Sequence, residues 1–446
     1  AGRRVMGAAL HDFDDDTLIA AAARAPAPLI AVLDIGVSKT ACLAARRDSV
    51  LDLHPSRPLR VSGAGVQTAP AIASGKAADF DACARAIRVA MDDAAYMAGA
   101  PIKRVVATYS GPGLQSNIVR GGTRVKGKLI ATRDIEAAVD AAMQSLPTPQ
   151  RSFLHVEPLR YFIDDGAPVD DPLGHAGRTL TVEACAVTAP TDALNALKAC
   201  VRQAGADVEE IIAGPKAAGL AALTREEREA GALVLDIGAG AIGMAVFAEE
   251  GLVHAETVSI GGVRLTRDLA AKLRTSFAAA ERVKLAFGAV GASCDPREAI
   301  SAPKLGPDGR LEAATTLRGV IADTLTPRLM EMLLLARQQL ARAGFASGDG
   351  PRRAVIVGGG AAIPGLRELA VEALGMPVRI GRADVSGFDH GEAGPAYASA
   401  AGALRWRLDE PTLDDVEEHF QPTLAHVAAA MRDSALNAWR WLRDNF

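Results

Sequence analysis

The stretch Val-Leu-Asp-Ile-Gly occurs twice in this chain, at Val32–Gly36 and again at Val234–Gly238. Each copy ends an apolar run and leads through small residues into a second apolar run, a pattern that predicts two strands joined by a tight turn. Glycines in such a turn let a ligand approach the backbone, and the N–H groups of the turn suit an anion such as phosphate. The aspartates that end the first strands, Asp34 and Asp236, suit a hydrated Mg²⁺ ion.

A single turn of this kind is more often an ordinary hairpin. Two copies at corresponding positions of two α/β halves indicate instead a duplicated fold. We therefore expect the two turns to hold a polyphosphate from both sides, in a cleft between two domains.

A third glycine motif, "AVIVGGGAAIPGLRELA", places Gly358–Gly360 between a strand and a helix with Pro364 in its first turn. Three glycines let a base or ribose lie against bare backbone, although a close packing turn between strand and helix remains the alternative. Glu281 and Lys284 are three residues apart on one helical face and could reach an adenosine. Taken alone, two such residues more often form a solvated ion pair than a ligand contact.

The elements that must position these residues alternate between strands and helices, which predicts mixed or parallel sheets covered on both faces. Ser110–Val187 is predicted as an inserted small α+β module whose helix opens with a capping box at Thr132. The predicted strands are Leu29–Ile35, Thr40–Ala45, Leu59–Ala64, Arg104–Tyr109, Leu233–Ile237, Met244–Ala248, His254–Ile260 and Ala354–Val357, and the predicted helices are Phe80–Met97, Thr191–Ala204, Thr266–Phe287 and Leu317–Ala343.

Composition limits the class of protein. A chain of 446 residues suggests two to four domains, and a formal net charge of −4 gives no case for a nucleic-acid partner. The five cysteines show no C-x-x-C spacing, which is typical of buried thiols in a reducing compartment. The longest apolar stretch, Ala230–Ala248, contains Asp236 and several glycines and is a poor membrane span. No signal peptide opens the sequence, so we expect a cytoplasmic protein.

The last sixteen residues, "MRDSALNAWRWLRDNF", have a different character. On a helical wheel the apolar residues cluster on one face with arginines beside it, which predicts a helix lying in a membrane interface. A helix docked on the core is the alternative, and the preceding polar stretch Asp409–Ala430 argues against it. The residues expected to contact the membrane are Leu436, Trp439, Arg440, Leu442, Arg443 and Phe446.

Two phosphate turns followed by a glycine motif resemble the actin/Hsp70/sugar-kinase ATPase superfamily. Within it, "LDIGVSKTACL", "ATYSGPGLQS", "IGGVRLTRDLA", "AERVKLAFG" and "VIVGGGAAIPGL" resemble the FtsA family of bacterial cell-division proteins. The most specific part is the pattern HV-P-x-x-Y-x-x-D…DP-x-G…G-x-x-L at His155–Leu180, which is characteristic of the insertion in that family. The resemblance runs from about Leu29 to about Leu404 and resumes at the C-terminal helix.

The resemblance implies an α/β, actin-like (ribonuclease H-like) duplicated fold with a small inserted α+β subdomain and a C-terminal amphipathic helix. The first actin-like domain would comprise residues 29–109 and 188–230, with the insert at 110–187. The second would comprise residues 231–262 and 353–408, with its small subdomain at 263–352. An extension at 1–28 would precede them, and a linker at 409–430 and a membrane-targeting helix at 431–446 would follow.

The resemblance also implies ATP and Mg²⁺ as ligands, with Asp34 and Asp236 holding the metal through water. Lys39 would add a point charge to the phosphates. The remaining implied nucleotide-binding residues are Gly36, Val37 and Ser38 in the first turn, Gly238, Ala239 and Gly240 in the second, and Gly262, Glu281, Lys284, Gly358, Gly359 and Gly360 around the nucleoside.

The second turn departs from the family pattern, because Ala241, Ile242 and Gly243 stand where a hydroxyl and often an acidic residue are usual. Gly214 likewise stands where an acidic or amide residue would polarise water. Backbone binding survives these changes, but positioning of a nucleophilic water suffers. We therefore expect ATP binding with at most weak hydrolysis, and no catalytic residue is assigned.

The function implied is that of a scaffold that polymerises at the division site, tethers FtsZ filaments to the inner membrane and helps recruit later division proteins. The expected partners are the FtsZ tail, further copies of this chain and an anionic membrane surface, at the cytoplasmic face of the septum. The tail would dock on 263–352, with Arg282, Arg318 and Arg328 as candidate contacts. The alternatives are a PilM-type pilus-assembly scaffold, which shares the insert but lacks the terminal helix, and a kinase of the same fold.

Overall fold

The computed structural model describes residues 28–46, 59–68, 80–345, 350–383, 385–386 and 391–409. The expected linker and membrane helix, and the extension that precedes the first strand, lie outside these residues. Within the described ranges no helix is both long enough and apolar enough to cross a membrane.

The first half of the chain is built on a five-stranded sheet in the order β10-β5-β1-β2-β4. β1 pairs antiparallel with β2 through the first predicted turn and parallel with β5, which in turn pairs parallel with β10. The elements of this half are β1 (Leu29–Ile35), β2 (Thr40–Arg46), β3 (Leu59–Arg60), β4 (Gly63–Gln67), α2 (Phe80–Ala98), β5 (Arg104–Tyr109), α4 (Thr191–Ala204), β10 (Asp207–Ala213) and α5 (Gly214–Ala222).

The second half repeats this topology in the order β19-β18-β11-β12-β13. β11 again pairs antiparallel with β12 and parallel with β18, so the duplication inferred from the two turns is confirmed at the level of strand order. Its elements are α6 (Arg225–Ala230), β11 (Ala232–Ile237), β12 (Ile242–Ala248), β13 (Gly251–Val258), α7 (Gly262–Leu273), α8 (Phe277–Phe287), β14 (Ala299–Ser301), β15 (Lys304–Leu305), β16 (Leu311–Glu312), β17 (Thr315–Leu317), α9 (Arg318–Arg342), β18 (Ala354–Val357), η2 (Gly359–Ala362), α10 (Leu366–Leu374), β19 (Val378–Ile380), β20 (Val385–Ser386), η3 (Gly391–Tyr397) and α11 (Ala398–Asp409).

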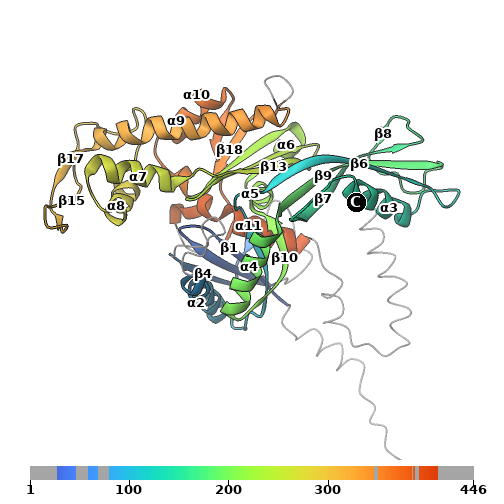
Figure 1. Ribbon diagram of the computed structural model, residues 1–446, viewed down its shortest axis with the longest axis horizontal. Helices are drawn as coiled ribbons and strands as arrows, with labels where there is room; N and C mark the ends of the chain where they lie inside the picture. The colour runs from blue at the N-terminus through green and yellow to red at the C-terminus, as the bar shows by residue number, and fades with distance from the viewer. Residues whose placement is uncertain are drawn as a thin grey trace, which may run out of the picture.

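The insert extends the sheet of the second half, although it interrupts the first half in sequence. Its strands continue the order as β13-β6-β9-β7-β8, and the junction is the pair Glu256 and Gln115. Figure 1 shows the insert at one end of the molecule and α7, α8 and β15 at the other. Its elements are β6 (Gln115–Arg124), α3 (Thr132–Gln144), β7 (Arg151–Ile163), β8 (Pro168–Val169) and β9 (Thr179–Pro190).

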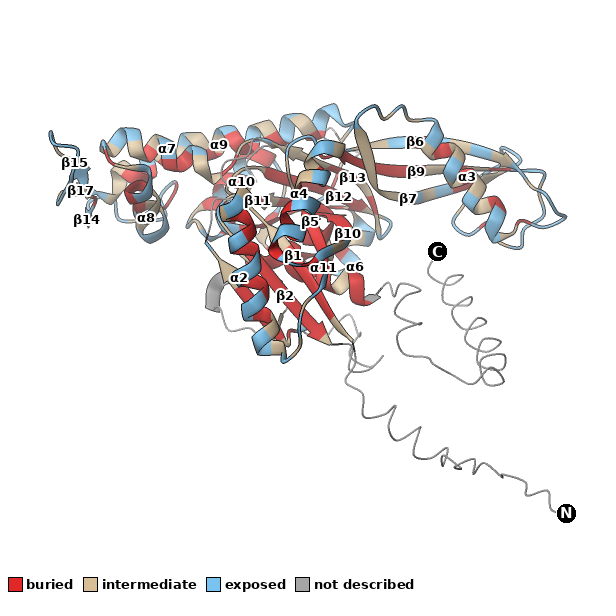
Figure 2. Cartoon of the chain, turned by 60° about the horizontal axis from the view of Figure 1, so that its bottom comes forward, coloured by how far each residue is buried: buried red, intermediate tan, exposed pale blue. Residues whose placement is uncertain are grey.

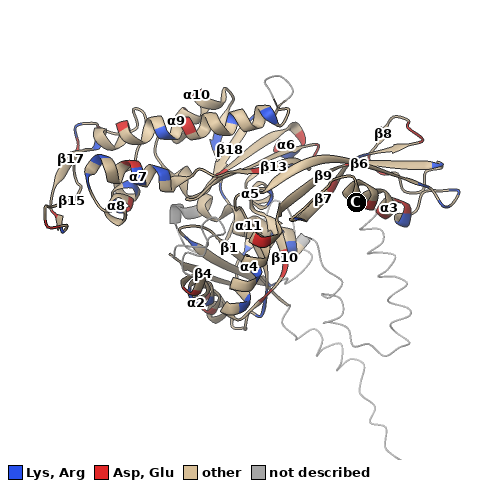
Figure 3. Cartoon of the chain, in the orientation of Figure 1, with Lys and Arg blue, Asp and Glu red and all other residues tan. Residues whose placement is uncertain are grey.

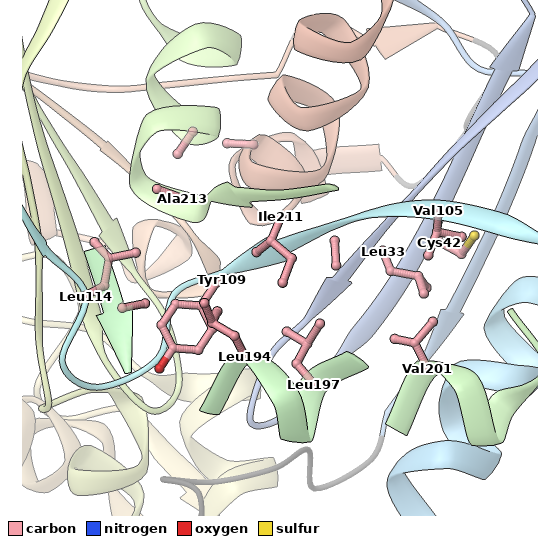
Figure 4. Close-up of a cluster of buried hydrophobic side chains, with 14 of the residues drawn as sticks. Leu33, Cys42, Val105, Tyr109, Leu114, Leu194, Leu197, Val201, Ile211 and Ala213 are labelled. Atoms are coloured by element: carbon pink, nitrogen blue, oxygen red, sulfur yellow. The ribbon is translucent and has the colours of Figure 1, made fainter. Parts of the chain in front are cut away.

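Helices α5 and α11 pack directly on each other between the two sheets, with α11 against β1, β2 and β5 and α5 against β11, β12 and β13. A Cβ at Gly402 of α11 would collide with the carbonyl of Ala217 in α5, so only glycine allows this approach. The abundance of alanine and glycine in the sequence therefore serves close helix packing. One apolar core then joins residues of the first sheet, α4, the base of the insert and the second sheet, as Figure 4 shows for Leu33, Leu197 and Leu114. Figure 2 shows the buried residues concentrated in these sheets.

Several element boundaries differ from the sequence prediction, whereas strands Leu29–Ile35, Arg104–Tyr109 and Ala354–Val357 and helix Thr191–Ala204 are confirmed to the residue. The strand predicted over Leu59–Ala64 is wrong: β3 ends at Arg60 and β4 begins at Gly63. The helix predicted over Thr266–Phe287 is two helices, because Arg274 takes the left-handed conformation (φ 50°) and Ser276 caps α8.

Two predicted helix starts are also corrected. Thr132 is not the cap of α3: Ala131 takes that position, and the carboxylate of Asp134 accepts from its N–H at 3.0 Å. Pro364 does not open a helix, because a short η2 turn precedes it and α10 begins at Leu366. At the start of α3, the Asp134 side chain satisfies the backbone N–H of Ala131. Before α10, the chain makes the η2 turn first, so the helix begins after Pro364.

Candidate functional site

The two predicted turns have the same geometry. In the first, Gly36 N–H donates to the Lys39 carbonyl at 2.8 Å, and in the second, Gly238 N–H donates to the Ala241 carbonyl at 3.0 Å. A Cβ added to either glycine would lie 3.1 Å from the same carbonyl oxygen that it bonds. Each turn is therefore a four-residue hairpin closed by one hydrogen bond, and its glycine leaves little room for a side chain.

The turns also contact each other. A Cβ at Gly240 of the second turn would lie 2.5 Å from Cγ2 of Val37 in the first. Residues about two hundred positions apart in sequence thus meet at the junction of the two halves. Ser38, at the tip of the first turn, is exposed to solvent.

The two aspartates lie on the facing ends of β1 and β11, and each is held by a hydroxyl. Thr108 donates to Asp34 at 2.6 Å, and Ser399 of α11 donates to Asp236 at 2.8 Å. Burial, and then the nearby charge of Asp34, raise the pKa of Asp236 to about 6, although the Ser399 hydrogen bond opposes the shift. Burial and the neighbouring Asp34 carboxylate therefore both disfavour the ionised form of Asp236.

Lys39 is the cation of the site. Its ammonium donates to the Ala396 carbonyl and lies 3.8 Å from the centroid of the Tyr397 ring. Burial lowers the pKa of Lys39, and the charges of Asp34 and Asp236 oppose that shift, which places all three groups in one electrostatic neighbourhood.

The start of α7 docks on the second turn. Gly262 N–H donates to the Gly238 carbonyl at 3.0 Å and Val263 N–H to the Ala239 carbonyl at 2.9 Å. Lys284 of α8 lies 2.7 Å from Glu281 and donates to Thr266 at 2.9 Å and to the Gly262 carbonyl at 3.3 Å.

Gly262, Glu281 and Lys284 are therefore brought together beside the second turn. Glu281 accepts a further hydrogen bond from the Thr266 hydroxyl, so the ion pair fastens α8 to α7. This is more than the solvated pair that spacing alone describes.

The three glycines after β18 have different roles. A Cβ at Gly358 (φ 83°) would collide with the Asp236 carboxylate, and one at Gly360 would lie 2.5 Å from Ile237. Both therefore serve close packing against β11, the alternative considered from the sequence. Gly359 has no heavy atom within 4 Å of the place a Cβ would take, so it alone presents open backbone.

Four contributors to the site were missed from the sequence: Thr108, Ala396, Tyr397 and Ser399. Thr108 had a visible signal, since it follows three apolar residues in the strand "RVVATY" and carries a hydroxyl on a buried strand. Ser399 lies in a run of small residues whose pattern carries no polar signal, and Ala396 contributes only its backbone carbonyl. Gly214, considered for what it lacks, instead accepts a hydrogen bond from Ser399 at 3.3 Å and has no room for a side chain beside Ser110.

The arginines considered for partner binding are partly engaged. Arg318 bonds Glu298 at 2.8 Å and Arg328 bonds Asp268 at 2.6 Å, whereas Arg282 is exposed.

Within the described ranges, no group of three or more histidine, cysteine, aspartate or glutamate side chains is placed to bind a metal directly.

The two halves have the same strand order, they meet at the paired Asp-Ile-Gly turns, and an α+β insert interrupts the first half. This arrangement is an actin-like fold. The solved structure of a "PilM-PilN type IV pilus biogenesis complex" shares this fold with a TM-score of 0.58 at 20% identity, covering 86% of this chain and 99% of that one.

The chain belongs to the FtsA family of cell-division proteins. It is 34% identical over 425 residues to "Cell division protein FtsA" of Rhizobium meliloti (strain 1021), covering 94% of this chain and 95% of the relative. It is 30% identical over 385 residues to the protein of the same description from Pseudomonas aeruginosa, covering 86% and 90%. The family model "Cell division protein FtsA" matches residues 233–402, and "SHS2 domain inserted in FTSA" matches residues 111–188.

Proposed function

We propose that this cell-division protein binds MgATP between its two turns and holds it as a structural ligand. The observation that supports this most is the pair of hairpins in contact through Val37 and Gly240, with Asp34, Asp236 and Lys39 around them. Backbone N–H groups of the turns bind the phosphates, and Gly359 offers open backbone to the nucleoside. Lys39 leaves the Ala396 carbonyl to reach a phosphate oxygen.

The residues fit a magnesium ion held through water. The raised pKa of Asp236, whose first cause is burial and whose second is Asp34, indicates that a cation would stabilise the ionised pair. When bound, the ion neutralises phosphate charge. Asp34 and Asp236 orient its water ligands, while Thr108 and Ser399 hold the two carboxylates in place.

Hydrolysis is weak in this proposal. The second turn offers Ala239 and Ala241 in place of hydroxyl side chains, and Gly214 carries no group to orient water. Turnover should therefore stay below about one per second, the low end of ordinary phosphoryl-transfer rates. A steady-state ATPase assay that gives a faster rate would contradict this.

The bound protein polymerises at the septum and tethers FtsZ filaments to the cytoplasmic face of the inner membrane, where it helps recruit later division proteins. Membership of the FtsA family and the amphipathic pattern of residues 431–446 support this assignment. One short helix binds membrane weakly, so a polymer with many copies supplies stable attachment.

Co-sedimentation with FtsZ on anionic liposomes tests the tether. FtsZ should pellet with vesicles only when this protein is present and only when FtsZ keeps its C-terminal tail. Trp439→Glu should release both proteins from the vesicles, whereas Trp441→Glu, the same change on the opposite side of the expected helix, should not. FtsZ binding that ignores its tail would reject the docking, and unchanged vesicle binding by Trp439→Glu would reject the membrane helix.

The same experiment separates the alternative functions. A PilM-type scaffold shares the fold and the insert but would bind neither vesicles through residues 431–446 nor the FtsZ tail. A kinase of this fold would transfer a phosphoryl group from ATP to a small substrate and would carry no FtsZ to the vesicles.

A further inference from the structure

Two cysteines of the first half lie opposite each other in the apolar core. Cys83 is near the start of α2 and Cys200 is in α4, and both are fully buried. They belong to the core that joins the first sheet to α4. The proposed nucleotide site uses neither of them, so a different chemistry has to account for two thiols at one place.

The two thiols are in contact. The Cys200 Sγ lies 3.9 Å from the Phe80 carbonyl oxygen, and Phe80 precedes Cys83 by three residues, the spacing of neighbours on one helical face. A hydrogen bond to Cys83, and then burial, raise the pKa of the Cys200 thiol above its ordinary value. The Cys200 sulfur therefore reaches the backbone of α2 beside Cys83, which is the close approach that a disulfide between two helices needs.

Polar contacts fix how α2 and α4 lie against each other. Figure 3 shows acidic and basic residues on both helices. Gln203 Nε2 donates to the Asp81 carboxylate at 2.7 Å. The Arg88 guanidinium donates to the backbone carbonyls of Gln203 and Ala204, at 2.7 and 3.1 Å. These contacts lie on both sides of Cys83 along α2, so neither helix can slide along the other without breaking them, and the two sulfurs stay opposed.

Two other buried cysteines have different surroundings. Cys42 of β2 lies in the same core, and burial alone raises the pKa of its thiol to about 12. Burial, and then the Glu157 carboxylate, raise the pKa of Cys185 to about 12, and the side-chain partner of this thiol is the Ser116 hydroxyl. Neither shift involves a second thiol. Cys42 and Cys185 are therefore matched controls for the pair, since they are equally buried.

The pair occupies a place in the fold where a covalent link has a structural effect. α2 packs on β4 and β2 at one edge of the first sheet, and α4 packs on β10 at the other edge. Figure 1 shows the two helices beside each other on this sheet. The chain between the two cysteines contains β5 and the whole insert. A bond between the sulfurs would therefore join the two edges of the sheet and close the segment that leaves for the insert and returns.

We propose that Cys83 and Cys200 are a redox site, at which a peroxide forms a reversible disulfide that holds the first half together. One sulfur displaces hydroxide from the peroxide and becomes a sulfenic acid, and the second sulfur displaces hydroxide from that group to form the S–S bond. The two thiols are oxidised, and hydrogen peroxide is reduced to two waters that take up the two thiol protons. Two molecules of a small thiol reverse the reaction by exchange and leave as their own disulfide. Because both sulfurs are buried, oxidation proceeds through local opening of α2 or α4 and is slow.

Peptide mapping of the folded full-length chain tests the pairing. Cys294→Ser first removes the partly exposed thiol, which would otherwise react earliest. After prolonged treatment with hydrogen peroxide and alkylation of the remaining thiols, a digest without reductant should contain a peptide linked through Cys83 and Cys200. Cys42 and Cys185 should be alkylated, and dithiothreitol should release the linked peptide. Absence of this peptide, a link to Cys42, or disulfide-linked dimers as the main product overturns the proposal.

Single alanine variants identify the partners. Cys83→Ala and Cys200→Ala should each abolish the linked peptide and leave the other sulfur free for alkylation. Cys42→Ala, the matched change in the same core, should keep the link. Thermal unfolding checks that each variant is folded before oxidation. A disulfide that Cys200 still forms within the Cys83→Ala chain would assign it another partner and overturn the pairing.

Equilibrium with glutathione shows whether the fold favours the bond. The disulfide content is measured across ratios of oxidised to reduced glutathione, in the folded chain and in urea, starting from both reduced and oxidised protein so that slow access does not bias the result. If the fold suits the bond, its equilibrium constant should be at least about tenfold larger in the folded chain than in urea. By linkage, the oxidised protein should then unfold at a higher temperature than the reduced protein. An equal or smaller constant in the folded chain would show that the fold opposes the bond and overturns the proposal.

Discussion

At the scale of single residues, loss of the Asp236 carboxyl proton is less favourable in the folded protein than in the unfolded chain. Its pKa, about 6, lies above the ordinary carboxyl value of 3.8, first because of burial and then because of Asp34. Below pH 3.8 the group is protonated in both folded and unfolded states and carries no penalty. As the pH rises through 6 the folded state must release the proton, and the stability contributed by the protonated form is lost.

Asp236→Asn should therefore raise the free energy of unfolding at pH 8 by about 1–3 kcal/mol, with most of this gain absent at pH 4. Urea unfolding at the two pH values measures the difference. The exposed Asp308, whose side chain is 59% exposed, supplies the control Asp308→Asn, which should change little at either pH. An equal gain at pH 4 and pH 8 would contradict the electrostatic cause.

Gly240 and Gly359 provide a second residue-scale prediction. Gly240→Ala pushes a methyl group into Val37 and should destabilise the protein by about 1–3 kcal/mol, the usual cost of overpacking. Val37→Ala should recover most of that loss in the double variant. Gly359→Ala meets open space and should stay within about 0.5 kcal/mol of wild type in thermal unfolding. A lack of recovery in the double variant would show that the two turns do not touch.

At the scale of elements, β7 of the insert, β10 and α11 meet at His155. Its Nε2 accepts the Ala213 N–H at 3.0 Å, so the ring is neutral, and the ring makes a T-shaped contact with Trp406. Burial, and then the charge of Lys216, hold the pKa of His155 well below 6.5. The stability contributed by neutral His155 is fully present above pH 6.5. It is lost as the pH falls below that value, because the unfolded state then binds a proton that the folded state does not bind.

His155→Gln keeps an acceptor for Ala213 N–H but cannot titrate. Wild type should therefore lose stability relative to this variant between pH 6.5 and 5, with a slope of up to about 1.4 kcal/mol per pH unit. Urea unfolding curves across this range measure it. His155→Leu, which removes the acceptor, should be less stable than His155→Gln at every pH. Parallel pH profiles for wild type and His155→Gln would remove His155 as the cause.

At the scale of the whole molecule, the proposed nucleotide contacts both halves, so its binding should stabilise them together. At an ATP concentration one hundred times the dissociation constant, the free energy of unfolding should rise by about 2.7 kcal/mol. Calorimetry should show a single transition that moves as a unit. Lys39→Met keeps most of the side-chain volume and should reduce the shift, and movement of only part of the transition would place the ligand on one half alone.

The amino-acid sequence by itself determined the two hairpins, the duplication and most strands and helices. These depend on local patterns: β1 and β11 are apolar runs that end at Asp-Ile-Gly, and a strand–turn–strand needs only neighbours in sequence. The motifs of the insert are local as well, which is why the FtsA family could be inferred from short stretches. The split at Arg274 escaped prediction although Ser276 is a residue type that favours a helix cap, because nothing in the local pattern marks Arg274 as left-handed.

Only the tertiary structure decided how the insert joins the molecule and what surrounds the aspartates. The insert pairs with β13 because the end of β6 reaches the free side of the second sheet, a position that no local pattern encodes. Ser399 bonds Asp236 across 163 residues, and Lys39 bonds the Ala396 carbonyl across 357. Such contacts depend on which surfaces the packing of α11 against α5 brings together, and Gly402 makes that approach possible. Periodicity reports which face of an element is buried, but the partner that buries it is chosen by the complementary shapes of distant elements.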